Sequence, residues 1–503
     1  MAWQVSGVVE LEKVTHSEAA EQVKTKLYKS RIRVAAVCTL HMAPAARTDP
    51  ITACHVVAVP YPGRGHVNPM MNLCKLLTTS KPDLLITFVV TEEWLGFIGS
   101  EEKPPSIRFA TIPNVLPSEL VRASDMPTFV GATQTKLAEP FELLLDRLDP
   151  PVNFIIADTF LFWAVEIGNR RNIPVASLWP MPASVFSVFY HFDLLERNGH
   201  HPFELSERGE ERVDYIPGIP SIRLADTPSL AHMKDQRLLR LALGIFPNLS
   251  KAQYLLISSI FELEPQVIEA LKQEFSFPVY TFGPAIPYFN LKKVTSFLTS
   301  QNDHGHHYFE WLNSQPPCSV LYVSLGSFLS VSSAQMDEFA DGLRESGIRF
   351  LWVARGEATR LQGRCGDVGR VVPWCEQLKV LCHSSVGGFW THCGWNSTME
   401  AIFAGVPIMT FPLTMDQTTV RKHVVEDWKI GWDAKKGLEA GNLLRSGAIA
   451  ELVKKFMDLE SVERKEIATR AKELQKVTLQ AVSEGGSSKV NLTSFLNDIA
   501  SFS

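Results

Sequence analysis

Two separate series of short apolar segments, each followed by an amphipathic stretch, constrain the fold of this chain more than any other feature. The first series comprises residues 54–60, 84–90, 153–157 and 174–179. Each segment has the length and composition of one buried β-strand, and the stretches between them predict helices. Strands that alternate with helices form a parallel sheet with helices on both faces. The first series therefore predicts a doubly wound α/β domain.

The second series repeats this pattern over residues 319–325, 350–354, 385–389 and 406–411. A length of 503 residues suits two or three domains. We therefore expect an α/β fold with two Rossmann-like, doubly wound parallel-sheet domains that face each other across a cleft.

The domain boundaries follow from where the two series begin and end. Residues 1–50 show no clear hydrophobic period, and we expect a disordered N-terminal extension there. The N-terminal domain is expected over 51–285, and a less regular stretch at 286–305 predicts the interdomain linker. The C-terminal domain is expected over 306–480. Residues 481–503 predict a C-terminal helix that packs back on the N-terminal domain.

Composition excludes several classes of function. A net charge of -5 argues against sequence-independent binding of nucleic acid, which needs a basic surface. Eight cysteines without a C-x-x-C pair indicate reduced thiols and a cytoplasmic protein. No apolar run reaches the length of a membrane-spanning helix, so we expect no membrane insertion. Cys382, His383, His392 and Cys393 lack further ligands at a familiar spacing, and we expect no metal. We expect a monomer.

The segment from Trp374 to Gln417 carries the strongest chemical signal. A predicted strand ends in Thr391-His392-Cys393-Gly394, and Trp395-Asn396-Ser397 then begins a predicted helix. The first N–H groups of a helix are unpaired and lie at the positive end of its dipole, so such a loop can bind phosphate. Ligands in open parallel sheets bind at the carboxyl ends of the strands, where this loop falls. Gly394 permits close approach of the backbone, and the side chains of residues 392, 396 and 397 add donors.

Four further side chains in the same segment fit a nucleotide sugar. Trp374 can stack on a base, and Glu400, one helical turn beyond the loop, can accept from ribose hydroxyls. Asp416 and Gln417, at the next strand–helix junction, can bond sugar hydroxyls. Each residue alone has a simpler interpretation, such as a helix cap or a packing residue. Their combination within one segment favours a donor site.

This segment resembles the donor-binding signature of the plant UDP-dependent glycosyltransferases of secondary metabolism, glycosyltransferase family 1. The resemblance extends from about Ile51 to the end of the chain. It includes Val323–Ser327, Ser259–Glu264, Phe282–Pro284 and Trp311–Gln315. It implies the GT-B arrangement of two Rossmann-like domains, with the acceptor on the N-terminal domain and the UDP-sugar on the C-terminal domain.

The resemblance also implies a role for each donor-site residue. Those that contact the nucleoside are Trp374 on uracil, Gln377 on uridine and Glu400 on the ribose. Those that hold the diphosphate are Ser327, His392, Asn396, Ser397 and the backbone at Trp395. Those that bind glucose hydroxyls are Asp416 and Gln417.

The last residue of the signature bears on the identity of the sugar. Gln417 is the family's usual residue for glucose, whereas His at this position tends to accompany galactose. The donor is therefore expected to be UDP-glucose, used as a co-substrate without a cofactor. The sequence departs from the common pattern at Glu376, Met415 and Val420, where Pro, Trp and Asn are frequent.

A second loop supplies the candidate catalytic base. Tyr61-Pro-Gly-Arg-Gly-His66 follows the first strand, and Asn68-Pro69 then predicts the start of a helix with Pro in its first turn. Transfer to a hydroxyl group needs a base, and a neutral imidazole suits this role at pH 7. Asp158 ends another strand at the same edge of the sheet, where its carboxylate can orient the imidazole.

Each of these two residues has a simpler interpretation. His66 could be a loop histidine bonded to backbone, and Asp158 could cap the next helix. The resemblance favours catalysis, since it implies that His66 is the general base and Asp158 its partner. Direct attack opposite the departing UDP then predicts inversion at the anomeric carbon.

The acceptor is predicted only as a class. Residues 179–191 are rich in aromatic side chains, which suit a flat apolar acceptor but also suit a helix core. Phenolics, flavonoids, terpenoids and hormones remain candidates. Two alternatives stay open, namely another UDP-sugar or a non-catalytic homologue that binds a UDP-sugar or small molecule. The incomplete G-x-G-x-x-G at Gly63 disfavours a nicotinamide-dependent oxidoreductase, and Asp158 lacks the acidic partner that a glycosidase needs.

Overall fold

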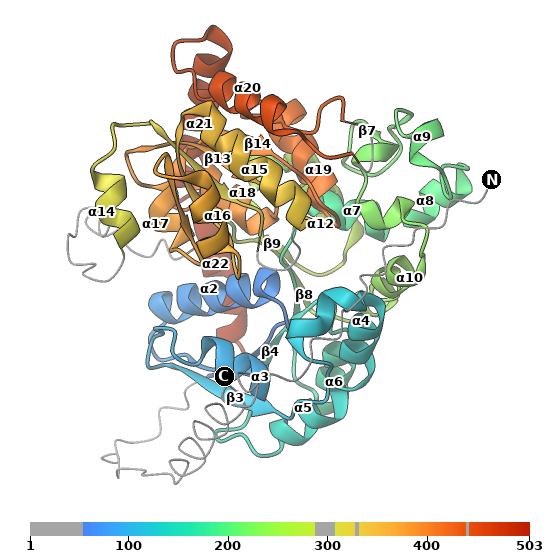
Figure 1. Ribbon diagram of the computed structural model, residues 1–503. Helices are drawn as coiled ribbons and strands as arrows, with labels where there is room; N and C mark the ends of the chain where they lie inside the picture. Colours follow the sequence, from blue (N-terminus) through green and yellow to red (C-terminus); the bar gives the residue numbers. More distant parts are fainter. Residues whose placement is uncertain (1–53, 287–306, 327–330, 439–441, 503) are drawn as a thin grey trace, which may run out of the picture. The chain divides into compact units, whose positions relative to one another are not determined.

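The computed structural model describes residues 54–286, 307–326, 331–438 and 442–502, and the structural statements below concern these residues (Figure 1). The predicted extension at 1–50 lies outside them, as does the linker at 286–305 apart from Ile286. The chain from Thr52 to Ser503 forms one compact unit.

The N-terminal half contains nine strands. They are β1 (His55–Val59), β2 (Leu85–Thr91), β3 (Ile107–Ile112), β4 (Phe154–Asp158), β5 (Val175–Trp179), β6 (Arg212–Val213), β7 (Ile222–Arg223), β8 (Tyr254–Ile257) and β9 (Val279–Thr281). Its α-helices are α2 (Arg64–Ser80), α3 (Glu92–Ile98), α4 (Met126–Thr135), α5 (Ala138–Leu145), α6 (Trp163–Arg171), α7 (Ala183–Tyr190), α8 (Phe192–Arg197), α9 (Leu205–Arg208), α10 (Arg237–Leu243), α11 (Phe246–Leu249) and α12 (Pro265–Glu274). Its short 3-10 helices are η1 (Glu119–Ser124), η2 (Leu224–Asp226), η3 (Ser229–His232) and η4 (Phe261–Leu263).

The C-terminal half repeats the alternation of strands and helices. Its strands are β10 (Val320–Ser324), β11 (Arg349–Val353), β12 (Gly369–Val372), β13 (Val386–Thr391), β14 (Ile408–Thr410) and β15 (Gly431–Asp433). Its helices are α14 (His307–Asn313), α15 (Ser333–Ser346), α16 (Ala358–Cys365), α17 (Gln377–Leu381), α18 (Trp395–Ala404), α19 (Gln417–Lys422), the π-helical turn η5 (His423–Asp427), α20 (Ser446–Phe456), α21 (Val462–Ala481) and α22 (Ser487–Ala500).

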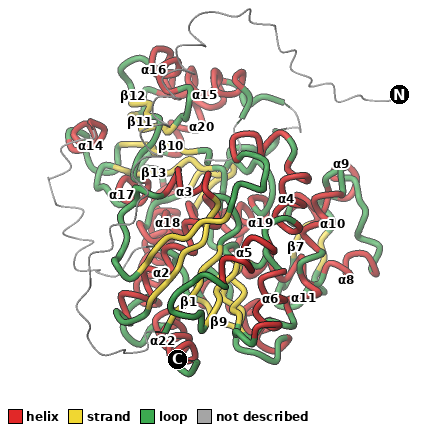
Figure 2. The backbone as a smooth tube through the Cα atoms, turned by 90° about the horizontal axis from the view of Figure 1, so that it is seen from below, coloured by secondary structure: helices red, strands yellow, loops and turns green. Residues whose placement is uncertain are grey.

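Two parallel sheets organise the molecule. The first has the strand order β3-β2-β1-β4-β5-β8-β9, and the second has the order β12-β11-β10-β13-β14-β15. Every neighbouring pair within these two sheets is parallel. In Figure 2 the yellow strands run side by side with red helices along them. The predicted fold class of two Rossmann-like domains is confirmed.

Both sheets reverse their winding beside their first strand. In the first sheet β1 lies between β2 and β4, and in the second β10 lies between β11 and β13. The chain therefore leaves neighbouring strands in opposite directions at β1/β4 and at β10/β13. Such a switch point opens a crevice at the carboxyl ends of the two strands. Each half thus has one predetermined place for a ligand.

The C-terminal helix α22 packs on the first sheet. It contacts β9 and α2, although it lies at the other end of the chain (Figure 1). Phe495 is buried among Phe154, Tyr254 and Tyr280, with ring centroids 5.7–6.1 Å apart. Tyr280 also donates a 2.8 Å hydrogen bond to Asp498. This packing covers a face of the sheet that would otherwise expose apolar side chains.

Helix α2 differs from the sequence-based prediction. It begins at Arg64, with Gly63 as its N-cap, rather than at Asn68-Pro69. Pro69 consequently lies inside the helix, where it removes one main-chain hydrogen bond. The prediction of a helix start at Pro69 was wrong because another part of the chain satisfies the carbonyl that Pro69 leaves free, as described below.

Candidate functional site

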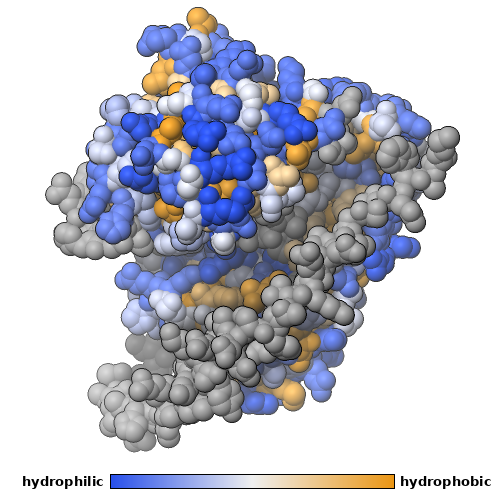
Figure 3. Space-filling model, in the orientation of Figure 1, coloured by the Kyte–Doolittle hydropathy of each residue, from blue (hydrophilic) through white to orange (hydrophobic). Residues whose placement is uncertain are grey.

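A cleft of about 1430 Å³ is lined by residues from both halves of the chain. The face drawn in Figure 3 is mostly hydrophilic, with hydrophobic side chains gathered in a hollow across its middle. Ten of the predicted site residues line the cleft, namely His66, Trp374, Gln377, His392, Trp395, Asn396, Ser397, Glu400, Asp416 and Gln417. Asp158 lies behind His66, and Ser327 falls outside the described residues.

The predicted catalytic pair lies at the switch point of the first sheet, and the predicted phosphate-binding residues lie at that of the second sheet. His66 lies in the first turn of α2, directly after β1, and Asp158 is the last residue of β4. His392 follows β13, whose neighbour β10 ends at Ser324. The topology therefore brings His66 and Asp158 together although they are 92 residues apart in the sequence.

His66 and Asp158 form a hydrogen-bonded pair. Nδ1 of His66 lies 2.8 Å from Oδ2 of Asp158, whose side chain is 0% exposed. The other carboxylate oxygen accepts from the N–H of Phe160 at 3.0 Å. Helix α6 begins later, with Phe162 at its N-cap, so Asp158 does not cap it. Its carboxylate is instead available to orient the imidazole.

The carboxylate partner determines which imidazole nitrogen can act. An acceptor at Nδ1 requires the proton there, which leaves the lone pair of Nε2 unprotonated in neutral His66. The ring packs between Tyr61 and Phe160, at centroid distances of 4.9 and 5.7 Å, and its side chain is 21% exposed to the cleft. The pair thus holds the imidazole in a fixed orientation at the wall of the cleft, as a general base would require.

The residues of the predicted phosphate site gather at the start of α18. The helix begins at Trp395 with Gly394 as its N-cap and without a capping side chain, so its first N–H groups face the cleft. Gly326 lies beside it with φ of +93°, and a Cβ there would come within 2.6 Å of Nε2 of His392. Only glycine allows the loop after β10 to approach the imidazole this closely.

His392 is neutral in this site. Burial lowers the pKa of its imidazole to about 4. A neutral ring offers one N–H donor and one acceptor nitrogen. Trp395 serves a different purpose, since its indole is buried and donates to the main-chain carbonyl of Ser258. Only its backbone can contribute to the donor site.

Gln377 links three residues around the expected ribose position. Its Nε2 donates to Ser397 Oγ and to Glu400 Oε2, each at 2.9 Å, and its Oε1 accepts from the hydroxyl of Tyr322 at 3.1 Å. The side-chain amide therefore bonds protein groups and holds Glu400 and Ser397 in place. Burial raises the pKa of Glu400 to about 7. Trp374 lies at the rim of the cleft and is 52% exposed, as a stacking surface requires.

Asn396 connects the two switch points. Its Nδ2 donates at 2.9 Å to the carbonyl of Gly65, which is four residues before Pro69 in helix α2. A proline has no N–H to fill that helical position, so the carbonyl is available to a partner from the other half. The missing main-chain hydrogen bond at Pro69 therefore makes room for a contact between α2, which carries His66, and α18, which carries Asn396.

The predicted sugar-binding pair lies at the start of α19, where Asp416 is the N-cap and Gln417 is the first residue of the helix. Burial raises the pKa of Asp416 to about 6, and His66 opposes this shift electrostatically. Gln417 Oε1 accepts from the N–H groups of Leu413 at 2.7 Å and Thr414 at 3.1 Å. Its amide oxygen is thus held by its own loop, and its NH₂ group remains to donate to a ligand.

The wall of the cleft beyond His66 is apolar. The side chains that line it from the N-terminal half include Met126, Val130, Phe160, Met181, Phe189 and Leu238. Of the aromatic stretch 179–191, only residues 180, 181 and 189 line the cleft, whereas Trp179 and Phe186 are fully buried in the core. Such a wall can receive an apolar molecule whose hydroxyl group reaches the imidazole.

Sequence reasoning missed two residues of the site. Tyr322 lies inside strand β10, where its pattern indicated core, but its hydroxyl bonds Gln377. Arg355 follows β11 and lines the cleft, and its place after a strand could have identified it. Among the described residues, no group of three or more His, Cys, Asp or Glu side chains could hold a metal ion. No helix in the described part of the chain has the length and apolarity to span a membrane.

Comparisons with known proteins find a matching family and similar plant sequences. A family model described as UDP-glucoronosyl and UDP-glucosyl transferase matches residues 247–453. UDP-glycosyltransferase 87A2 of Arabidopsis thaliana is 51% identical over 448 residues, which cover 88% of this chain and 96% of that relative. UDP-glycosyltransferase 87A1 of the same plant is 50% identical over 443 residues, covering 88% and 99%.

Solved structures show the same similarity. Phytolacca americana UGT2 complexed with UDP-2fluoro-glucose and pterostilbene superposes with a TM-score of 0.75 at 27% identity, over 89% of this chain and 100% of that one. Os79 from O. sativa in complex with U2F and trichothecene gives a TM-score of 0.75 at 27% identity, over 88% and 100%.

Proposed function

Because the chain belongs to the family of plant UDP-dependent glycosyltransferases, we propose that it transfers glucose from UDP-glucose to a hydroxyl group of a small, largely apolar acceptor. Transferase activity with a UDP-sugar follows from membership of the family. The glucose, the acceptor class and the residue roles below are the proposal.

The observation that carries the mechanism is the His66–Asp158 pair at 2.8 Å, in one cleft with the start of α18. The acceptor hydroxyl gives its proton to Nε2 of His66 while its oxygen forms a bond to the anomeric carbon. The bond between that carbon and the β-phosphate oxygen breaks, and UDP departs with the electron pair. Attack from the face opposite UDP inverts the anomeric configuration. General-base assistance of this kind contributes roughly 10²–10⁴-fold.

The departing diphosphate is stabilised by fixed dipoles in this proposal. The free N–H groups at Trp395 and Asn396, the hydroxyl of Ser397 and the neutral imidazole of His392 surround its position. Such groups are oriented before the reaction begins, so little reorganisation opposes the charge that develops. The predicted independence from metal ions stays a prediction, as do the cytoplasmic location and the monomeric state.

The uridine and the sugar are assigned to opposite ends of the donor site. Trp374 stacks on the base and Glu400 accepts from the ribose, with Gln377 holding Glu400 in place. Asp416 accepts from glucose hydroxyls, and the NH₂ group of Gln417 donates to them. For Gln417, this assignment uses the NH₂ group, because the amide oxygen already accepts from the N–H groups of Leu413 and Thr414.

The acceptor is assigned to the apolar wall beyond His66. The relatives from Phytolacca americana and O. sativa are complexed with pterostilbene and trichothecene, respectively. By similarity, we assign this chain an acceptor of comparable size and low polarity, such as a phenolic, flavonoid, terpenoid or hormone. The wall supplies area for burial, and the imidazole selects the hydroxyl group that reacts.

The test is UDP release from purified protein. UDP-glucose, UDP-galactose and UDP-xylose are offered in turn with a panel of phenolic and terpenoid alcohols. Release that depends on the acceptor and is fastest with UDP-glucose supports the proposal. Faster release with another donor contradicts the glucose assignment, and binding of UDP without release from any pair supports a non-catalytic homologue.

A further inference from the structure

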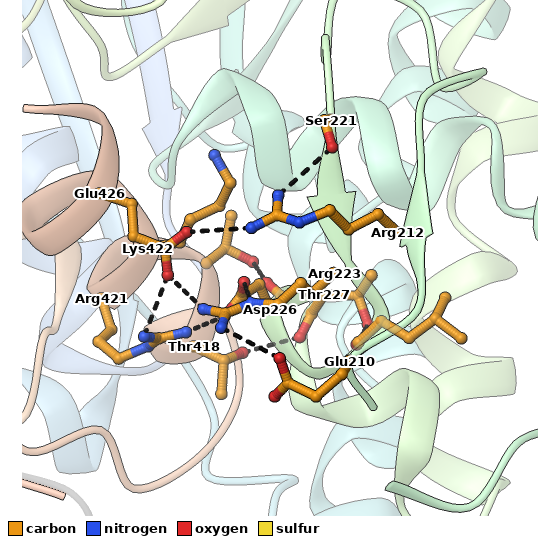
Figure 4. Close-up of polar contacts among 12 residues, drawn as sticks. Glu210, Arg212, Ser221, Arg223, Asp226, Thr227, Thr418, Arg421, Lys422 and Glu426 are labelled. Carbon is orange, nitrogen blue, oxygen red and sulfur yellow. Dashed lines mark hydrogen bonds and ion pairs between the residues drawn. The ribbon is translucent and has the colours of Figure 1, made fainter. Parts of the chain in front are cut away.

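The sugar-binding loop is held by a segment from the other half of the chain. Residues Leu413–Asp416 precede α19, which begins at Gln417, and Asp226–Ser229 runs from the end of η2 to the start of η3 in the N-terminal half. Four hydrogen bonds join residues 414, 415 and 418 to this segment. Figure 4 shows the one between Thr418 and Thr227. None of the residues of Asp226–Ser229 belongs to the donor signature.

Ser229 satisfies both main-chain groups of Met415. Its Oγ accepts from the N–H of Met415 at 2.6 Å, and its own N–H donates to the carbonyl of Met415 at 2.8 Å. Met415 has φ of +63°, in the left-handed region that residues with a Cβ rarely adopt. This conformation persists only where the surroundings determine it. Ser229 supplies that determination at the residue directly before Asp416.

The hydroxyl of Ser229 also contacts Thr414, the residue that precedes Met415 in the loop. Ser229 Oγ lies 3.0 Å from Oγ1 of Thr414. The N–H of Thr414 in turn donates to Oε1 of Gln417. Thr414 therefore links the hydroxyl of Ser229 to the side chain that is proposed to bind glucose. A shift of Thr414 would therefore change where the NH₂ group of Gln417 points.

The segment that carries Ser229 is itself anchored by ionic contacts. Asp226 is fully buried and accepts from Arg223 Nε at 2.7 Å and from Nη2 of Arg421, which lies on α19. Arg223 and Arg421 also share the carboxylate of Glu426 (Figure 4). Each guanidinium thus joins a residue of the N-terminal half to one of the C-terminal half. The two guanidinium groups thus compensate the charge of the buried Asp226, and Glu426 bonds both of them at the partly exposed side of the cluster.

Two threonines of α19 complete the contact. Thr418 Oγ1 donates to the carbonyl of Thr227, and Thr419 Oγ1 donates to the carbonyl of Asp226, each at 2.7 Å. The first turn of α19 begins with Gln417. The hydroxyls therefore fix the orientation of the helix turn from which the sugar-binding amide projects.

We propose that Ser229 is a positioning residue for the donor sugar, which holds Met415 in its left-handed conformation and so aims Asp416 and Gln417 at the sugar hydroxyls. This inference rests on the proposed roles of Asp416 and Gln417. The described residues assigned to uridine and diphosphate lie on α17 and α18 or in the loops directly before these helices, whereas the hydrogen bonds of Ser229 go to Thr414 and Met415. Loss of the Ser229 hydroxyl should therefore change the selectivity for the donor sugar and leave the affinity for UDP unchanged.

The test is Ser229→Ala, which removes the hydroxyl and keeps the main-chain N–H. Steady-state constants are measured with UDP-glucose and with UDP-galactose, which differs in the orientation of one hydroxyl, and the Kd of UDP is measured separately. We expect kcat/KM for UDP-glucose to fall about tenfold, as the loss of buried hydrogen bonds allows, and the ratio of UDP-glucose to UDP-galactose to shrink. The Kd of UDP should change by less than about twofold.

Two further variants make this test specific. Ser488→Ala removes another buried hydroxyl that bonds a distant carbonyl, that of Gly283, away from the sugar loop, and should keep the wild-type ratio. Thr418→Val removes the bond to Thr227 and should shrink the ratio, whereas Thr418→Ser should restore it. The Thr418 pair gives the answer even if Ser229→Ala does not fold.

Two results would overturn the inference. One is an unchanged sugar ratio in both Ser229→Ala and Thr418→Val. The other is a loss of UDP affinity equal to the loss of kcat/KM, which would indicate general loosening of the donor site. A wild-type protein that prefers a donor other than UDP-glucose would contradict the proposed function alone, because the inference concerns the change in ratio between variant and wild type.

Discussion

Nδ2 of Asn396 donates a 2.9 Å hydrogen bond to the main-chain carbonyl of Gly65, across the cleft between the two halves of the molecule. Gly65 directly precedes the candidate base, and Asn396 is in the first turn of the candidate phosphate helix. The bond therefore couples the position of His66 to that of the departing diphosphate. Geometry of this kind determines how often the reacting atoms meet in alignment.

Asn396→Ala removes this coupling together with one donor to the phosphates. We expect kcat/KM to fall at least about tenfold, since a lost hydrogen bond to a charged group contributes about 1.5–3 kcal/mol. Steady-state kinetics measure the effect. Asn198→Ala is the matched control, because its amide donates at 2.8 Å to the carbonyl of Leu194 on the exterior. Equal kinetics in the two variants would contradict the coupling.

Asp158→Asn tests the orientation of the imidazole. An asparagine amide can donate to Nδ1 of His66, which moves the imidazole proton to Nε2 and removes the base from the cleft. We expect kcat to fall by roughly 10²–10⁴-fold with the Kd of UDP unchanged. Asp193→Asn, at a half-exposed carboxylate paired with Arg197, serves as the control. Retention of wild-type kcat by Asp158→Asn would remove Asp158 from the mechanism.

Glu400→Gln tests the buried carboxyl at the ribose position. The pKa of Glu400 is raised from 4.5 to about 7, so its ionisation opposes folding. This penalty is absent below about pH 4.5, grows as the pH rises toward 7 and is complete above it. The glutamine variant never ionises but can still accept from Gln377. Its Tm without ligand should exceed that of the wild type at pH 8, and the difference should vanish near pH 4.5.

Thermal unfolding of the wild type and of Glu400→Gln is measured from pH 4.5 to 8. Glu466→Gln, at an exposed position on α21, should match the wild type throughout. A Tm difference for Glu400→Gln that stays constant from pH 4.5 to 8 would show that ionisation of this carboxyl does not oppose folding.

Phe495→Ala tests the packing of the C-terminal helix on the first sheet. Removal of a fully buried aromatic ring leaves a cavity and should lower the free energy of unfolding by about 3–5 kcal/mol. Denaturant titration measures the loss. Val490→Ala lies on the same helix at a position that is 49% exposed and should change the stability by less than about 0.5 kcal/mol. Similar losses in both variants would mean that α22 is not docked through Phe495.

Of the described strands in the two sheets, the sequence predicted β1, β2, β4, β5, β10, β11, β13 and β14, and it missed β3, β8, β9, β12 and β15. Strands buried on both faces of a parallel sheet read as continuous apolar runs, and those at β1, β2, β4 and β5 were located within one or two residues. Strand β3 gave no such signal, because its central residues are only partly buried.

The start of α2 could not be predicted from local sequence. Asn68-Pro69 has the composition of a helix start, and the rule fails here because Asn396, 331 residues away, bonds the carbonyl that Pro69 leaves free. The same limit applies to the aromatic stretch 179–191. Its composition does not show that Phe186 faces the core while Phe189 lines the cleft.

The donor segment was visible because most of its side chains lie within one stretch of the sequence. The contacts that orient them come from elsewhere, as with Tyr322 on Gln377 and Ser229 on Met415. A motif reports which residues a site needs, and the tertiary structure determines how they are held.

The most direct test of the account is turnover by His66→Ala with UDP-glucose and an accepted alcohol, measured as UDP release beside the Kd of UDP. We predict that acceptor-dependent release falls by at least about 10²-fold while the Kd of UDP stays within about twofold of the wild type. Full turnover in this variant would contradict the central claim that His66, oriented by Asp158, takes the proton from the acceptor.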